Sequence, residues 1–196
     1  QLAGLSVAQV GRLSTAQVAA LTTGQVAGLS ATQVTSLSSA ATAALTTSQV
    51  QALTTAQVQG LTTTQLNSLP TAQVSSMQTA DVAALSVTQV ASLNTASVAA
   101  LSSTQAQALS SAQVAGLTTT QIGALETADL SALSTGQLAG LSATQIGRLS
   151  TAQVAALTTG QVAGLSATQL AILSTAATAA LTTAQVQALT TAQVRG

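Results

Sequence analysis

The chain has 196 residues, of which 3% are charged, and it contains no aromatic residue, histidine or cysteine. An average soluble domain is about 25% charged, so this is not an ordinary globular composition. Acid–base and nucleophilic catalysis draw mainly on His, Cys, Lys, Tyr and carboxylates, and three acidic residues are all that the chain offers of these groups. The composition therefore predicts a protein that is not an enzyme and that uses no cofactor or metal ion.

The same composition narrows the class of partner. Zero net charge and three scattered arginines provide no basic patch, and the absence of aromatic rings leaves no platform for base stacking, which argues against nucleic-acid binding. Ser, Thr or Gln recurs every few positions, so no stretch of about 18 apolar residues exists and no membrane insertion is expected. The partners that remain are neighbouring repeats of the same chain, a second copy of the chain, or a surface ligand.

An eight-residue repeat runs along the chain. A large apolar residue recurs every eight positions from Leu5 to Leu189, with Met77 as the one substitute, which defines 24 octads over residues 5–196. We number the positions of each octad 1 to 8 from this residue. Position 2 is Ser or Thr in 20 octads, position 5 is Gln in 19, and position 6 is Val, Leu or Ile in 21.

The spacing excludes one continuous helix. Eight residues advance an apolar stripe by about 80° around a helix axis, so no face stays buried along the chain. Within an octad, however, the residues form a capping box, as in Ser-Thr-Ala-Gln at residues 14–17. The hydroxyl accepts a hydrogen bond from the third helical residue, and the glutamine reaches back to the N-cap amide. Leu13 and Val18 flank the box at the positions of a hydrophobic staple.

We therefore predict an all-α fold with one short capped helix of about five to six residues per octad. Helices this short are unstable alone, so successive octads must stack to stabilise them. The predicted core is Leu at position 1 and Val at position 6, while small residues at positions 7 and 8 let neighbouring backbones approach. The octads look equivalent, which predicts a solenoid with two to four octads per coil, as a single domain over residues 1–196.

A β-solenoid is the alternative fold. Thr and Val favour strands, and ladders of Gln or Thr suit stacked strands. Against this, Ala, Leu and Gln favour helices, and the apolar positions 1 and 6 lie five residues apart rather than on one face of a strand. The short-helix solenoid is therefore the preferred interpretation.

In chain order, the first departure from the consensus is Ala-Thr in place of Gln-Val at residues 41–42. Octads 9 and 10, residues 69–84, are the least regular, because Pro70 and Gln78 replace the capping hydroxyl. Proline suits a helix start, whereas glutamine is a poor N-cap and Asn94, in the same slot, is a good one. Either this region bends the solenoid locally or it follows the same path as its neighbours.

Glu126 and Asp129 form the one acidic cluster of the sequence. Calcium takes six to eight oxygen ligands, and nothing near these two carboxylates supplies the rest. We expect them to occupy the N-cap and the third helical position, where negative charge suits the helix dipole, and Asp81 to replace the repeat glutamine at that third position. No residue is predicted to be catalytic, cofactor-binding or metal-binding.

The three arginines, Arg12, Arg148 and Arg195, occupy positions 7 or 8 of their octads. These positions fall at the ends of the predicted helices, where cations are favoured by the helix dipole. Their expected role is solubility and complementarity to the helix ends.

The two ends of the chain repeat each other. Residues 5–60 and 141–196 match at 47 of 56 positions, an offset of 17 octads, and the deviant octad is copied with them. Such nested copying indicates tandem duplication in a longer natural array. Neither end carries the polar capping repeat that solenoids use for solubility, so we expect a fragment of a longer array whose ends favour self-association.

Threonines at positions 2 and 3, such as those at residues 22–23 and 46–47, predict an ordered array of hydroxyl and methyl groups. Flat, uncharged Thr and Ala surfaces resemble those of ice-binding proteins. This resemblance implies an alternative function as an ice-binding or polymer-surface-binding module. The structural interpretation is that these residues cap helices and stay solvated.

Tracts such as Leu-Thr-Thr-Ala-Gln-Val-Gln-Ala at residues 181–188 resemble the short degenerate repeats of large bacterial secreted or cell-surface, adhesin-like proteins. The resemblance covers the whole chain. It implies a non-enzymatic, extracellular role as a stalk, spacer or adhesive surface, and it transfers no functional residue.

Overall fold

A computed structural model describes residues 4–195. Within this range the chain consists of short helices and turns, with one helix of four to six residues in each octad and no strand. The all-α prediction is therefore confirmed, and the β-solenoid alternative is wrong for the described residues. The capping box decides between them, because each box commits the three residues that follow the N-cap to helical geometry.

The chain divides into two compact units, residues 1–100 and 101–196, and each is described by itself. The helices of the first unit are α1 (Val7–Val10), α2 (Thr15–Ala19), α3 (Thr23–Ala27), α4 (Ala31–Ser36), α5 (Ser39–Ala43), α6 (Thr47–Gln51), α7 (Thr55–Gly60), α8 (Thr63–Ser68), α9 (Thr71–Ser76), α10 (Thr79–Ala84), α11 (Val87–Ser92) and α12 (Thr95–Ala99).

The second unit has the same design. Its helices are α13 (Ser103–Ala108), α14 (Ser111–Ala115), α15 (Thr119–Ala124), α16 (Thr127–Ala132), α17 (Thr135–Ala139), α18 (Ala143–Ile146), α19 (Thr151–Ala156), α20 (Thr159–Gly164), α21 (Ala167–Ala171), α22 (Thr175–Ala179), α23 (Thr183–Gln187) and α24 (Thr191–Arg195). A single domain over residues 1–196 stays a prediction.

The helix starts are the capping boxes that the sequence predicts. Before α7, Thr54 has an extended backbone with φ −80° and ψ 154°. Its N–H donates to Gln57 Oε1 at 2.7 Å, and its hydroxyl accepts from the Gln57 N–H at 3.3 Å. The same pair of bonds begins α2 and α23. Each box gives partners to two backbone N–H groups that a one-turn helix leaves unpaired: the N–H of the N-cap and the N–H of the third helical residue.

The helix ends need no glycine. After α7, Leu61 has φ −60° and ψ 133°, and the next residue, Thr62, has φ −70° and ψ 157°. Two successive extended residues therefore turn the chain out of one helix and into the next N-cap. Among the described residues no backbone φ is positive, so the turn is available to any L-residue and can be repeated octad after octad.

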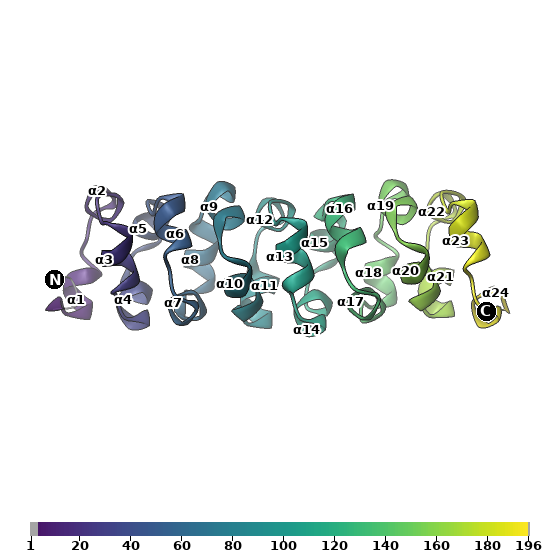
Figure 1. The fold of residues 1–196 in the computed structure, drawn as a ribbon, viewed down its shortest axis with the longest axis horizontal. Helices are drawn as coiled ribbons and strands as arrows, with labels where there is room; N and C mark the ends of the chain where they lie inside the picture. The colour runs from purple at the N-terminus through teal and green to yellow at the C-terminus, as the bar shows by residue number, and fades with distance from the viewer. Residues whose placement is uncertain (1–3, 196) are drawn as a thin grey trace. The chain divides into compact units, whose positions relative to one another are not determined.

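Within each unit, a helix stacks on the helix three octads later, so one coil contains three octads. The first unit thus has three columns of stacked helices: α1, α4, α7 and α10; α2, α5, α8 and α11; and α3, α6, α9 and α12 (Figure 1). In the second unit α13, α16, α19 and α22 form one column, and α14 and α15 begin the other two. The predicted range of two to four octads per coil is resolved to three.

The core is built from three positions rather than two. In the interior coils positions 1 and 6 are buried as predicted; Leu61, for example, is 3% exposed and Val58 is 0% exposed. The glutamine at position 5 is buried beside them, and Gln57 is only 1% exposed. Positions 2 and 4 face the solvent, position 3 is exposed or half-buried, and positions 7 and 8 lie between these extremes.

The irregular octads keep the same path. Pro70 and Gln78 occupy N-caps without a side-chain capping bond, yet α9 and α10 are both six residues long and stack on α6 and α7. Asn94 caps α12 by accepting from the Ser97 N–H at 2.8 Å. Of the two interpretations of octads 9 and 10, the structure therefore favours the regular path over a local bend.

Candidate functional site

The repeat glutamine at position 5 joins two coils. The Oε1 atom of Gln57 accepts from its own N-cap amide, as the capping box requires. Its Nε2 atom points the other way and donates to three backbone carbonyls of the preceding coil: Val26 at 2.8 Å, Ala27 at 3.3 Å and Leu29 at 2.6 Å. These carbonyls lie at the C-terminal end of α3 and just beyond it, where helix geometry leaves several carbonyls short of amide partners, although Val26 O also accepts from the Leu29 N–H at 3.2 Å.

The same contact recurs through both units, and it defines the glutamine rows of this protein. Gln49 donates to Val18 O at 2.9 Å and to Leu21 O at 2.6 Å. In the second unit, Gln161 donates to Leu130 O at 3.0 Å and to Leu133 O at 2.8 Å, and Gln185 and Gln193 repeat this arrangement one coil further on. One side chain thus caps its own helix start and a helix end in the coil before it.

The sequence pattern did not predict this second role of the glutamine. The capping-box pattern accepts Glu as readily as Gln at the third helical position, because only the side-chain oxygen serves the box. The chain nevertheless has Gln at this position in 19 octads and Glu in none. A carboxylate has no hydrogen to donate, so only the amide satisfies both the N-cap and the carbonyls below. The use of Gln and never Glu at this position was the feature of the sequence that could have predicted the contact between coils.

At Pro70, the glutamine of the octad loses its bond to the N-cap but keeps its bonds to the preceding coil. Proline has no N–H, so the Oε1 atom of Gln73 is buried without a hydrogen-bond partner. Its Nε2 atom still donates to Ala43 O at 3.1 Å and to Leu45 O. The contact between coils is therefore kept where the cap is lost.

Asp81 and Asp129 replace the repeat glutamine, and both are 3% exposed. A hydroxyl from position 3 of the preceding coil donates to each: Thr55 to Asp81 Oδ1 at 2.8 Å, and Ser103 to Asp129 Oδ1 at 2.7 Å. The second oxygen, Oδ2, of each aspartate is buried without a hydrogen-bond partner. Asp129 lies in the first turn of α16, at the third helical position as expected, and its burial there is an addition that the sequence did not predict.

Burial raises the pKa of Asp129 above its ordinary value of 3.8. The hydrogen bond from Ser103 opposes this shift and the nearby charge of Glu126 adds to it. Glu126 itself lies at the N-cap of α16 as predicted, but it is exposed and makes no side-chain capping bond. The cluster does not gather further ligands: no group of three or more His, Cys, Asp or Glu that could hold a metal ion exists within residues 4–195.

The arginines lie on the surface. Arg195 is in the last turn of α24, as expected. Arg12 and Arg148 lie just beyond α1 and α18, because these two helices stop at position 6 and a glycine follows as the C-cap. Arg148 borders a shallow hollow that Thr119, Thr120 and Gly123 complete.

The outer surface carries rows of small polar residues. Because one coil is three octads, position 3 of every third octad falls in one column. In the first unit this places exposed threonines at Thr23, Thr47, Thr71 and Thr95, each as the first residue of a helix in the column of α3. The predicted array of threonines therefore exists as a row across stacked helices.

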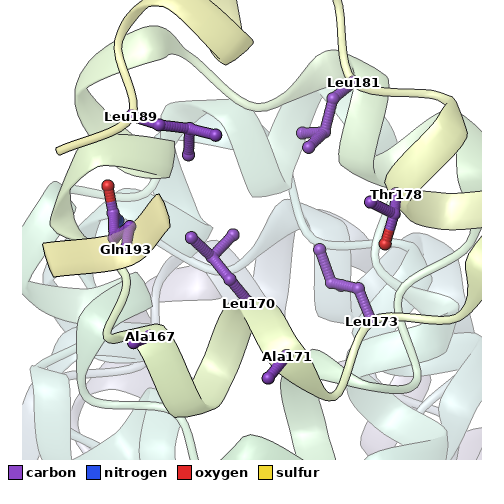
Figure 2. Close-up of a pocket in the computed structure, with 8 residues that line it drawn as sticks. All are labelled: Ala167, Leu170, Ala171, Leu173, Thr178, Leu181, Leu189 and Gln193. Atoms are coloured by element: carbon purple, nitrogen blue, oxygen red, sulfur yellow. The ribbon is translucent and has the colours of Figure 1, made fainter. Parts of the chain in front are cut away.

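An apolar hollow of about 250 Å³ lies at the C-terminal end of the second unit. The side chains of Leu170, Leu173, Leu181 and Leu189 point toward one another around it (Figure 2). Ala167, Ala171, Thr178 and Gln193 complete its lining.

Among the described helices none is long and apolar enough to cross a membrane. The chemistry that the described residues offer is hydrogen bonding between coils and a hydroxyl-rich exterior with few charged side chains.

Comparison with curated proteins found no match. A family model, described as the ALTTAQ repeat, matches residues 1–31, 74–111 and 122–159, which together make up more than half of the chain. The six letters of the family name spell Ala-Leu-Thr-Thr-Ala-Gln, which is the sequence of residues 52–57. This stretch is position 8 of one octad followed by positions 1 to 5 of the next. These six residues include the capping box and the glutamine that joins the coils. With its capped octads and glutamine rows, the chain belongs to the ALTTAQ repeat family.

Proposed function

We propose that the chain is a non-enzymatic structural segment of a large extracellular bacterial protein, where it acts as a stalk, spacer or adhesive surface. The observation that carries the proposal is the glutamine contact, which bonds each coil to the one before it and leaves a solvent-facing surface of small uncharged residues. In such an array each coil depends only on its neighbours, so length can change without a change of fold. Secretion or display at the cell surface rests on the resemblance of the octads to repeats of adhesin-like proteins.

The absence of enzymatic activity is proposed from composition. The chain has no His, Cys, Lys or Tyr, so its three carboxylates are its only side chains of the kinds that usually act as general bases. The buried carboxylates of Asp81 and Asp129 each face a hydroxyl of the neighbouring coil, which supports a structural role for them.

The spacer proposal is tested by removing one coil. Thr23 and Thr95 are exposed and lie in one column, three coil spacings apart, and the chain has no native cysteine that would compete for a label. Packed helices are about 8–10 Å apart, so spin labels at Thr23→Cys and Thr95→Cys should be separated by roughly 24–30 Å. Deleting residues 29–52, which are three whole octads, should shorten the distance to two spacings, roughly 16–20 Å, with the helical circular dichroism per residue unchanged.

The matched control deletes only residues 45–48. This shorter deletion puts positions 1 and 6 out of phase and should broaden the distance distribution and reduce the helical signal. If deleting residues 29–52 abolished the helical signal, or left the distance between the labels unchanged, the spacer proposal would be wrong.

The exposed threonine row favours a second candidate function, binding to ice or to a repetitive polymer surface. Thr47 and Thr71 are adjacent members of the row, and lysine at both positions would interrupt the array of hydroxyl and methyl groups. A surface binder should show thermal hysteresis or polymer binding that Thr47→Lys/Thr71→Lys removes. A spacer should show neither before or after the substitution.

A further inference from the structure

The glutamine contacts between coils are not evenly distributed within the first unit. Where α7, α8 and α9 stack on α4, α5 and α6, all three columns have the contact, and we call this the complete interface. Each of its three glutamines donates through Nε2 to the leucine carbonyl 28 residues earlier. The pairs are Gln57 with Leu29 O at 2.6 Å, Gln65 with Leu37 O at 2.9 Å, and Gln73 with Leu45 O.

The next interface has this contact in one column only. It lies where α10, α11 and α12 stack on α7, α8 and α9, and we call it the depleted interface. In the middle column, Gln89 donates to Leu61 O at 2.8 Å. In the other two columns Asp81 and Ser97 occupy the position of the glutamine, and neither has a side-chain amide. Two of the three buried amide donors are therefore missing.

The depleted interface also buries polar atoms that have no partner. Asp81 is 3% exposed and Ser97 is 0% exposed, and Asp81 Oδ2 and Ser97 Oγ make no hydrogen bond. The carbonyl oxygens that a glutamine would reach, Leu53 O and Leu69 O, receive no side-chain donor from the described residues. At the complete interface, the one such side-chain atom is Gln73 Oε1. Water can satisfy these groups once the coils separate, so their burial favours opening.

The bonds that replace the missing contacts lie on the surface. Gln78 donates to Gln51 O at 2.7 Å, and the Asn94 N–H donates to Asn67 Oδ1 at 2.8 Å. The side chains of Gln78, Asn67 and Asn94 are exposed, and water competes for exposed hydrogen bonds. In all three columns the helices also pack less extensively across the depleted interface than across the complete one. The replacement bonds therefore stabilise the interface less than three buried amides would.

We propose that the depleted interface is a built-in opening point of the first unit. When the chain is destabilised or stretched, α10–α12 separate from α7–α9 before α7–α9 separate from α4–α6. The physical reason is that coils contact only their neighbours, so opening starts at the interface with the fewest satisfied contacts. The inference concerns the order of opening inside the first unit, and it does not rest on the spacer proposal.

Two pairs of exposed threonines in one column provide the test. Thr47 and Thr71 span the complete interface, Thr71 and Thr95 span the depleted one, and the chain has no native cysteine. Spin labels on Thr47→Cys/Thr71→Cys or on Thr71→Cys/Thr95→Cys lie one coil spacing apart, roughly 8–10 Å, and their dipolar broadening reports separation of the two coils. In a urea titration of the 196-residue chain, the Thr71–Thr95 pair should lose its broadening at the lower urea concentration.

Two variants shift the missing contacts from one interface to the other. Asp81→Gln/Ser97→Gln supplies both amides to the depleted interface, and it should raise the urea midpoint of the Thr71–Thr95 pair to that of the Thr47–Thr71 pair or above. Gln57→Asp/Gln73→Ser copies the depletion onto the complete interface in the same two columns. It should lower the midpoint of the Thr47–Thr71 pair to that of the Thr71–Thr95 pair or below.

Ala80→Gln/Ala96→Gln is the matched control, because it adds two amides to α10 and α12 at exposed positions, and it should leave the order of opening unchanged. Circular dichroism without urea verifies that each variant is helical. Equal midpoints for the two label pairs in the unmodified chain, or earlier loss of the Thr47–Thr71 broadening, would overturn the proposal. So would an Asp81→Gln/Ser97→Gln variant whose Thr71–Thr95 midpoint does not rise. The spacer proposal is judged separately, by deletion of residues 29–52.

Discussion

The side-chain amide of the repeat glutamine is irreplaceable by a carboxylate of the same shape. In Gln57→Glu one oxygen can still accept from the Thr54 N–H, but the other would face the carbonyl oxygens of Val26 and Leu29, at 2.8 Å and 2.6 Å from the atom it replaces. Burying a polar group without a partner costs about 1–3 kcal/mol, and more for a charged group. Gln57→Glu should therefore lower the free energy of unfolding at neutral pH by more than about 2 kcal/mol.

Chemical denaturation measures this change, and Gln59→Glu is the control. Gln59 is exposed at position 7, so its substitution should stay within about 0.5 kcal/mol. Equal losses for the two variants would show that the contact between coils contributes nothing measurable.

Asp129 gives the native chain a pH-dependent stability. Its pKa is raised in the folded state by burial, and its Oδ2 atom has no partner. The folded state therefore holds a proton more tightly than the unfolded state, so the contribution of Asp129 is fully present below the unfolded pKa, near 3.8, and is lost as the pH rises through the folded pKa.

Denaturation curves from pH 3 to pH 8 should thus show stability that declines above about pH 4. In Asp129→Asn this decline should be smaller, because the amide does not titrate and its Nδ2 atom can donate. Glu126→Gln, an exposed neighbour, serves as the control. A decline equally steep in Asp129→Asn would assign the pH dependence to another group.

At the scale of a single helix, Pro70 tests what the capping box contributes. In Pro70→Ala the new backbone N–H can donate to the unpaired Oε1 atom of Gln73, and in Pro70→Ser a hydroxyl can also accept from the Gln73 N–H. A hydroxyl N-cap is worth about 1 kcal/mol over alanine, while losing proline costs about 0.4–1 kcal/mol through the unfolded state.

The melting temperatures should therefore rise from Pro70→Ala to Pro70→Ser, with the serine variant at or above the native chain. Stability is measured by thermal circular dichroism. A serine variant less stable than the alanine variant would mean that this octad does not use the cap that its neighbours use.

The one-helix-per-octad design was predictable because its causes are local. The hydroxyl at position 2, the glutamine at position 5 and the flanking apolar residues define both ends of each helix within eight residues. The burial of positions 1 and 6 followed from the same pattern, and Leu61 and Val58 confirm it. The helices before Gly11 and Gly147 end earlier than expected, and glycine at position 7 is not sufficient to explain this, because α15 continues through Gly123 at the same position.

At the scale of the whole molecule, each coil is held only by its neighbours, so stability should vary along the chain. In the second unit α16 has stacked helices on both sides, α13 and α19, whereas α22, α23 and α24 are packed only against earlier coils. Local opening free energies should therefore be lowest in the last coil.

Hydrogen exchange at low micromolar concentration should show the amides of α22–α24 exchanging faster than those of α16–α19. The amides of α16 and α19 in the same sample provide the internal comparison, because these helices have stacked helices or a preceding coil against them. Uniform exchange along the second unit at low concentration would indicate one cooperative block in place of a chain of coupled repeats.

The coil size could not be read from the sequence because the octads are interchangeable. Residues 5–60 and their copy at 141–196 are 17 octads apart, which is not a multiple of three, so copied octads occupy different columns. The octad of α1 heads one column, while its copy, containing α18, lies in the column of α15 and α21. No column carries its own residues, and therefore no longer period appears in the sequence.

The amino-acid sequence by itself determined the elements of this protein: their length, their starts, their apolar positions and the near absence of ionisable groups. These follow from bonds and contacts within eight residues. Only the tertiary structure decided that three octads close a coil, that the glutamine also serves a helix end about 28 residues earlier, and that Asp129 is buried. Those features depend on the angle by which the two extended residues at positions 1 and 2 turn the chain between helices. That angle decides which groups meet across coils. The capping bonds are alike in most octads of all three columns and do not encode that geometry.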